Sequence, residues 1–482
     1  MSSADSNIKQ DFDQELVNIA HYVNNYEITS NLAYDTAYYC LMDSIACALQ
    51  ALDFPECTKH LGPYVPGTIV PNGARVIGTS HVLDPIKAAY DNGVLIRWLD
   101  YNDTWLAKEW GHPSDNFGGI LAVADFLARQ QLSKNKPCFT VKDVLTFAIK
   151  AHEIQGGTAL ENSFNKVGLD HVVLVKLAST AVVTKMLGGK LEDITSALSQ
   201  VFVDGQSLRT YRHAPNTGSR KSWAAGDATA RAVKLAMLTL KGEVGYPSAL
   251  TAKNWGFYDV CFKQNKFAYP DYFKFSSYVM ENVLFKISYP AEFHAQTAAE
   301  AAILLHPLVK NKLDSIAKIA LTTQEPAVRI ISKTGPLHNP ADRDHCLQYI
   351  VAIGLIHGSL TAQHYEDSVA IDPRIDFLRE CMTVSEDKQF TVDYYDPSKR
   401  AIGNSVQVFF NDGSCTDKIS IDYPVGHKNR RSEGLPLLEE KFQTSVMNYY
   451  SKRQASRIND LFSDKEKLLK MPINELMDGL VL

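Results

Sequence analysis

One stretch of the sequence gathers basic side chains and contains no acidic one. Residues 205–226 read GQSLRTYRHAPNTGSRKSWAAG, in a chain whose formal net charge is -5. The basic residues of this stretch are Arg209, Arg212, His213, Arg220 and Lys221. A helix is expected to begin between residues 222 and 227, and a helix N-terminus offers free N–H groups and a favourable dipole to an anion. The stretch therefore predicts a carboxylate or phosphate site, with a solvated basic loop as the alternative interpretation.

A second stretch, RWLDYNDTWLAKEWGHPSDNFGG over residues 97–119, combines carboxylate, hydroxyl and imidazole groups. Asp100 and Thr104 are four residues apart, so they share one face if the helix before them continues. His112 follows in an expected loop. Because an aspartate beside a histidine can fix the tautomer and the pKa of the ring, these residues could transfer protons. The alternative is a histidine that only caps a helix and packs.

Two further positions could contribute to a site. His171 is expected in the first turn of a helix after the cap Asp170, where the helix dipole disfavours imidazolium. A neutral ring at this position can accept a proton, or it can be a hydrogen-bonded residue of the core. Lys286 and His294 lie at the expected junction of two domains, and such junctions often form ligand clefts.

The elements that must position these residues are mostly helices. From about residue 15 to 260, apolar residues recur at helical spacing between short Gly, Pro, Asn and Asp breaks. Ser30 is an expected cap, and Asp84 is another, with Pro85 at the first helical position. The pattern changes near residues 315–332, which alternate like a strand. Residues 405–423 read as a hairpin through Asn411-Asp412-Gly413.

These patterns predict a mainly α protein with an α+β part. We expect a large helical domain built from both chain ends, with a smaller α+β domain inserted. The expected bounds are 1–283 for the first helical part, 284–425 for the α+β domain and 426–482 for the returning helices, the last beginning with a linker over 426–436. A length of 482 residues also favours two domains.

Composition excludes several classes of protein. No run of 18 apolar residues occurs, and the polar, acidic first residues lack the pattern of a secretory or mitochondrial signal, so we expect a cytoplasmic protein. The eight cysteines form no C-x-x-C pair, so no metal or cysteine-ligated cluster is expected. A pI near 6.3 argues against nucleic-acid binding, and one basic segment indicates a small anionic ligand.

Several long segments together resemble the MmgE/PrpD family. They include LDYNDTWLAKEWGHPSDN, ENSFNKVGLDHVVLVK, DGQSLRTYRHAPNTGSRKSWAAGDATARAV, SYVMENVLFKISYPAEFHAQTA and NPADRDHCLQYIVAI. The resemblance implies dehydration of 2-methylcitrate to 2-methyl-cis-aconitate in the methylcitrate cycle of propionate breakdown. It also implies a homodimer that needs no iron–sulfur cluster and no other cofactor, and it leaves side activity on citrate or cis-aconitate possible.

The resemblance also assigns roles to single residues. Its catalytic candidates are Asp100, His112, His171, Lys221 and Lys286. Its substrate-binding candidates are Thr104, His294 and Tyr349. The positive charges of Arg209, Arg212 and Arg220 make these residues further candidates to bind the tricarboxylate. We hypothesise that His112, oriented by Asp100, and His171 form the acid/base pair, and that Lys221 and Lys286 hold carboxylates of the tricarboxylate.

Two alternative functions remain at this point. The first is a cis-aconitate decarboxylase of the same family, which would release CO2. The second is a protein that binds a tricarboxylate without turnover.

Overall fold

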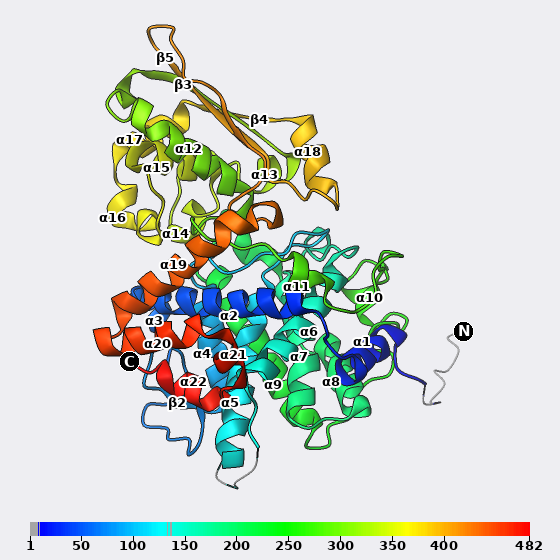
Figure 1. Cartoon of the computed structure of the whole chain (residues 1–482). Coiled ribbons are helices and arrows are strands. Elements are labelled where there is room, and N and C mark those ends of the chain that lie inside the picture. Colours follow the sequence, from blue (N-terminus) through cyan, green and yellow to red (C-terminus); the bar gives the residue numbers. More distant parts are fainter. Residues whose placement is uncertain (1–7, 9, 133, 135–136) are drawn as a thin grey trace, which may run out of the picture.

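The computed structural model describes residues 8, 10–132, 134 and 137–482. Its buried apolar side chains form two main cores. The helical core draws on residues between 16 and 287 and between 425 and 480. The small core draws on residues between 291 and 410. Figure 1 shows the larger helical body below and the smaller α+β part above it, so the predicted fold class is confirmed.

Most helices of the helical core come from the part of the chain before residue 283. They are α1 (Gln14–Asn25), α2 (Asn31–Ala51), α3 (Pro55–Thr58), α4 (Pro85–Arg97), α5 (Phe117–Leu132), α6 (Val141–Ala159), α7 (Val172–Met186), α8 (Leu191–Val203), α9 (Arg220–Thr239), α10 (Phe257–Val260) and α11 (Tyr278–Asn282). Two short strands, β1 (Ala74–Arg75) and β2 (Val82–Leu83), pair antiparallel. The predicted caps are confirmed: Ser30 Oγ accepts from Ala33 N, and the Asp84 side chain accepts from the N–H groups of Ile86 and Lys87, which follow Pro85.

The small core packs helices against a four-stranded sheet in the order β4-β3-β5-β6. The strands are β3 (Ile316–Thr323), β4 (Met382–Glu386), β5 (Asn404–Phe410) and β6 (Ile419–Ile421). The helices are α12 (Gln296–Val309), α13 (Glu325–Ile330), α14 (Pro340–Arg343), α15 (Leu347–His357), α16 (Asp367–Ala370), α17 (Pro373–Glu380) and α18 (Lys388–Tyr395). Strands β3 and β4 are parallel, whereas β5 pairs antiparallel with both β3 and β6. The predicted hairpin is therefore confirmed as the β5–β6 pair.

The C-terminal helices return to the helical core. They are α19 (Arg431–Tyr449), α20 (Lys452–Ser463), α21 (Lys465–Lys470) and α22 (Ile473–Gly479). Helix α19 packs on α2, and α22 packs on α5, so the red C-terminal helices lie beside the blue helix α2 in Figure 1. Within the described part of the chain, no helix is long and apolar enough to cross a membrane.

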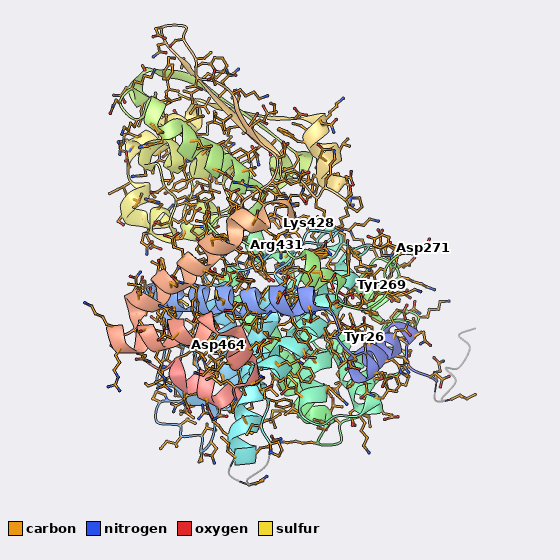
Figure 2. All side chains as sticks on the ribbon, viewed as in Figure 1. Tyr26, Tyr269, Asp271, Lys428, Arg431 and Asp464 are labelled. Carbon is orange, nitrogen blue, oxygen red and sulfur yellow. The ribbon has the colours of Figure 1, made fainter. Side chains whose placement is uncertain are left out.

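The prediction of a linker over residues 426–436 was wrong, because α19 already begins at Arg431. Figure 2 labels Arg431 near the boundary between the two parts, where its guanidinium donates to the Val283 carbonyl. The preceding Arg430 pairs with Glu300 of α12 at 2.9 Å. Gly434 lies against the Val425 carbonyl, where a Cβ would approach to 2.5 Å. These long-range contacts outweigh the local helix-breaking signals of glycine and Pro436.

Candidate active site

A small buried cavity lies where residues of both cores meet. The predicted site residues that line it are Asp100, Thr104, His112, His171, Arg209, Arg212 and Lys286. Arg97, Glu292 and His345 also line it and were not predicted. Its volume is about 30 Å³, which is the space of about one water molecule. The structure thus brings most of the predicted residues together, in a closed arrangement.

Asp100 lies in the loop after α4 rather than on a helix. The helix ends at Arg97, and Asp100 has a φ of 50°, so the expected shared helical face with Thr104 does not form. Its carboxylate accepts from the Arg97 guanidinium and from Lys286 Nζ at 2.5 Å. Burial alone would raise the pKa of Asp100, but these two cations outweigh it and hold the pKa well below its usual range.

His112 is fixed through both ring nitrogens. Its Nδ1 donates to the Asp103 carbonyl at 2.7 Å, and its Nε2 accepts from Arg97 at 2.9 Å. The Asp100 carboxylate lies 3.7 Å from Nε2. The ring is therefore oriented by Asp103 and Arg97 rather than by a hydrogen bond to Asp100. Burial, with the nearby Arg97 and Lys286 charges, holds the pKa of His112 well below its usual value, which leaves the ring neutral.

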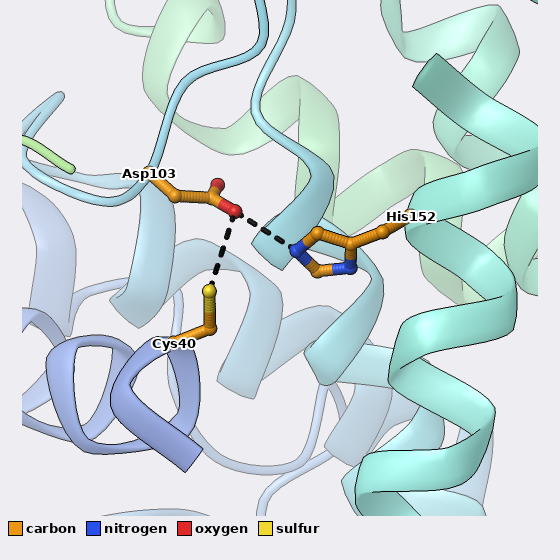
Figure 3. Close-up of side chains that lie close together, drawn as sticks. All are labelled: Cys40, Asp103 and His152. Atoms are coloured by element: carbon orange, nitrogen blue, oxygen red, sulfur yellow. Dashed lines mark hydrogen bonds and ion pairs between the residues drawn. The ribbon is translucent and has the colours of Figure 1, made fainter. Parts of the chain in front are cut away.

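A buried cluster behind His112 fixes the backbone that orients it. Figure 3 shows Asp103 between His152 of α6 and Cys40 of α2. His152 Nε2 donates to Asp103 Oδ2 at 2.9 Å, and Ser114 donates to Asp103 Oδ1 through both its N–H and its hydroxyl. All of these side chains are buried. Because both carboxylate oxygens of Asp103 are held, its carbonyl is also fixed toward His112.

His171 differs from His112 because neither of its ring nitrogens makes a hydrogen bond to a described residue, although Nδ1 lies 3.2 Å from Asp170 Oδ1. It lies in the turn before α7, after Asp170, whose carboxylate accepts from Val172 N at 3.2 Å. Neither ring nitrogen has a hydrogen-bond partner among the described residues, although the ring is 3% exposed. Burial lowers the pKa of His171 well below its usual value. A buried, neutral and unpartnered imidazole facing a cavity is suited to contact a ligand.

The basic stretch meets carboxylates that are distant in sequence. Arg212 forms an ion pair with Asp170, and Lys221 donates to both oxygens of Asp344 at 2.6 Å. Arg209 is 3.7 Å from Asp170, and its Nη1 has no hydrogen-bond partner in the described structure. The basic stretch contains no acidic residue, but the fold places carboxylates from other segments beside it. Among the described basic residues of this stretch, Arg209 alone has a buried donor nitrogen without a hydrogen-bond partner.

Some predicted residues lie outside the cavity. The Arg220 guanidinium stacks over Trp223 at 4.2 Å and its side chain is 39% exposed. His294 binds Glu292 through Nδ1 at 2.7 Å, and the Tyr349 hydroxyl donates to the His364 carbonyl. Lys221 does not line the cavity but contacts His345, which does.

The sequence interpretation missed residues that come from distant segments. Arg97 is the first residue of the stretch 97–119, and no chemical role was predicted for it. Asp344 and His345 form an Asp-His pair like that of residues 170–171, and this repetition was visible in the sequence. No local pattern indicated that residue 292 would reach the cavity.

One group of side chains at the site is close enough to contact a single ion. Ligand atoms of Asp100, Asp344 and His345 lie within 4.8 Å of one another. However, Lys286 and Arg97 bind the first carboxylate and Lys221 binds the second. Because these cations already engage the oxygens, the donor set is unsuited to a further cation.

A larger cavity adjoins the site at the boundary between the cores. Its volume is about 510 Å³, and Trp98, Ser222, Asp344 and Tyr365 are among its lining residues. Asp344 lines this larger space, and the next residue, His345, lines the small cavity.

Comparisons with known proteins agree along the whole chain. The MmgE/PrpD N-terminal domain matches residues 17–270, and the MmgE/PrpD C-terminal domain matches residues 289–467. A 2-methylcitrate dehydratase of Salmonella typhimurium (strain LT2) is 59% identical over 99% of both chains, and one of Escherichia coli (strain K12) is 58% identical over the same shares. A protein of Yarrowia lipolytica named "2-methylcitrate dehydratase, mitochondrial" is 56% identical over 98% of this chain and 91% of its own.

Proposed function

This chain belongs to the MmgE/PrpD family, and from that membership we propose that it is a hydro-lyase that dehydrates 2-methylcitrate to 2-methyl-cis-aconitate. Identity of 59% across almost the full length of a protein named 2-methylcitrate dehydratase carries the conclusion. The reaction would place the enzyme in the methylcitrate cycle of propionate breakdown.

The cavity offers the groups that this reaction needs. Dehydration breaks a C–H bond next to a carboxylate and a C–O bond, so protons must be exchanged with the substrate. We assign this exchange to His171, whose ring nitrogens make no hydrogen bond within the described part of the chain, rather than to His112, whose ring nitrogens are both engaged. His112 then contacts the substrate as a fixed neutral ring. Its orientation supports the geometry of the site without a change of charge.

Positive charges around the histidines suit a substrate with three carboxylates. Arg209 and Lys286 line the cavity, and we propose that they hold carboxylates of 2-methylcitrate. Negative charge builds on the carboxylate next to the breaking C–H bond, and a fixed cation stabilises it. Each charge-assisted hydrogen bond contributes about 1.5–3 kcal/mol.

Substrate entry requires a more open form. The cavity holds about one water molecule, which is far less than the volume of 2-methylcitrate. We therefore propose that the two cores act as separate domains that move apart to admit substrate and then close around it. Closure would exclude water and strengthen the charge interactions.

The test is dehydration by the purified full-length protein. The enzyme is given 2-methylcitrate in the presence of a metal chelator, and ultraviolet absorbance of the conjugated alkene is followed. An increase supports the proposal. No increase with 2-methylcitrate, together with CO2 release from cis-aconitate, would instead support the decarboxylase alternative, which the named relatives do not favour.

Assembly and location remain predictions from the resemblance and from the sequence. We propose a homodimer, which light scattering coupled to size-exclusion chromatography would test. A cytoplasmic location is likewise proposed, and imaging of the tagged protein in its own cell would test it.

A further inference from the structure

The sequence contains two Asp-His dipeptides, and the fold brings both to one cavity. They are residues 170–171, before α7 of the helical core, and residues 344–345, between α14 and α15 of the small core. His171 and His345 both line the small cavity. One imidazole with a neighbouring carboxylate is thus supplied from each side of the boundary.

The contacts of His345 define which ring nitrogen can act. Its Nδ1 lies 2.8 Å from Asp344 Oδ1. Because a carboxylate accepts, Nδ1 carries the proton and Nε2 keeps a lone pair. No hydrogen bond engages Nε2 within the described residues. His345 is therefore a neutral imidazole with its basic nitrogen available and a carboxylate behind it.

Lys221 holds this dipeptide in place from the other core. Its ammonium donates to both oxygens of Asp344 at 2.6 Å and lies 3.1 Å from His345 Nδ1. The Lys221 side chain is 1% exposed, so the ion pair is shielded from solvent. Lys221 belongs to the first turn of α9, whereas Asp344 follows α14. The pair therefore fixes His345 only when the two cores are together.

We propose that His345 is a catalytic base of this enzyme, supplied by the small core and positioned by Asp344 and Lys221. This inference rests on the proposed dehydration. His345 Nε2 takes the proton from the carbon next to a substrate carboxylate, and the C–H electron pair forms the C=C bond. The C–O bond breaks, and the departing hydroxide takes a proton from His171 in its imidazolium form, so that water leaves.

The surroundings supply each protonation state that the step requires. Burial and the Lys221 charge lower the pKa of His345, so the ring is neutral before reaction. Asp344 then stabilises the imidazolium that forms. The carboxylates of the bound substrate bring negative charge toward His171 and raise its pKa, which favours imidazolium there. His171 takes its proton from water when substrate binds and becomes neutral again on donating it to the leaving hydroxide. After product release, His345 returns the proton it abstracted to water, so both rings are neutral again.

The first test replaces His345 in the full-length enzyme. His345→Gln should lower kcat by about 10²–10⁴ with a much smaller change in KM. His338→Gln is the matched control, because His338 is an exposed histidine of the same segment; it should keep wild-type kinetics. A His345→Gln variant that keeps more than about a third of wild-type kcat overturns the assignment.

A second test separates chemistry from structure. In His345→Gly, added imidazole should restore part of the lost turnover, because it can replace the missing base. If His345→Gly folds and loses activity, and added imidazole does not restore any of it, the assignment is overturned. Failure of the proposed function looks different, since the wild-type enzyme itself would then form no alkene from 2-methylcitrate.

Discussion

The two walls of the cavity are built in different ways. On the helical side, Asp100 and His112 are held by Arg97 and by backbone within a single core. On the small-core side, His345 lies in a turn and is held across the boundary through Asp344 and Lys221. The first wall is held within one core, whereas the second is held by contacts between the two cores. In the domain motion that we propose, closure would complete the second wall and so control when the site reacts.

The helical wall has further support from the C-terminal end of the chain. Lys441 of α19 is buried behind it and donates to Asp43 at 2.7 Å and to the carbonyls of Tyr101 and Lys286 at 3.0 and 3.1 Å. The ammonium lies 3.3 Å from the Tyr101 ring centroid. The segments that carry Asp100 and Lys286 are thus joined through one cation, and no equivalent buried lysine was found on the small-core side among the described residues.

The largest effect on turnover is expected from His171→Gln, which changes a residue of the helical wall. Removing the free imidazole should lower kcat by about 10²–10⁴, because proton transfer to the substrate is lost. Steady-state kinetics with 2-methylcitrate measures this. His213→Gln, an exposed histidine of the basic stretch, is the control and should leave turnover within about twofold of wild type. Equal activity of the two variants would contradict the role of His171.

The support behind the helical wall predicts a large loss of stability in Lys441→Met. The change leaves Asp43 buried without its cation, at a cost of about 3–5 kcal/mol in the free energy of unfolding. Urea denaturation measures it. Lys452→Met, at an exposed position of α20, should change stability by less than about 0.5 kcal/mol. A loss below about 1 kcal/mol for Lys441→Met would show that this pair does not hold the wall.

Arg209 and Arg220 provide a matched comparison within the basic stretch. Arg209→Gln should lower kcat/KM by about 10–100-fold, because a buried cation facing the substrate is lost. Arg220→Gln should change it by less than about threefold, because that guanidinium is part-exposed and stacks on Trp223. Kinetics of both variants test this order. The reverse order would place the anion site outside the cavity.

A smaller effect, on the free energy of unfolding, is expected from acidification, because both walls of the cavity contain buried histidines. Burial lowers the folded-state pKa of His112, His171 and His345, whereas the unfolded rings titrate near about 6.5. Between the lowered and the unfolded pKa, the unfolded chain binds more protons, so stability falls as pH falls below about 6.5. Each ring contributes up to about 1.4 kcal/mol per pH unit. Urea unfolding at decreasing pH measures this, and a stability that rises on acidification would contradict the neutral rings.

Local signals in the sequence were sufficient for elements whose ends are set by neighbouring residues. The Ser30 and Asp84 caps and the β5–β6 hairpin were predicted because their chemistry lies within a few residues. The turn at Asp100 was not, since the pattern before it continues to look helical, while its φ of 50° is held by Arg97 and Lys286. Long-range contacts decided that position.

The sequence predicted the parts of the site whose residues lie close together in the chain and missed the contacts between distant segments. Asp100, Thr104 and His112 lie close together in sequence, and the structure places all three at the cavity. The partners of the basic stretch could not be predicted, because Asp170 and Asp344 come from 42 and 123 residues away. A run of basic residues in a sequence does not reveal which distant carboxylates the fold will place beside those residues.

The central claim is tested most directly by identifying the product formed from 2-methylcitrate. The chelator-treated, full-length enzyme is incubated with this substrate, and the product is analysed by mass spectrometry with carbon NMR. We expect a compound that has lost one water and retains every carbon, with the double bond of 2-methyl-cis-aconitate. Unchanged substrate, or a product that has lost CO2, would contradict the account.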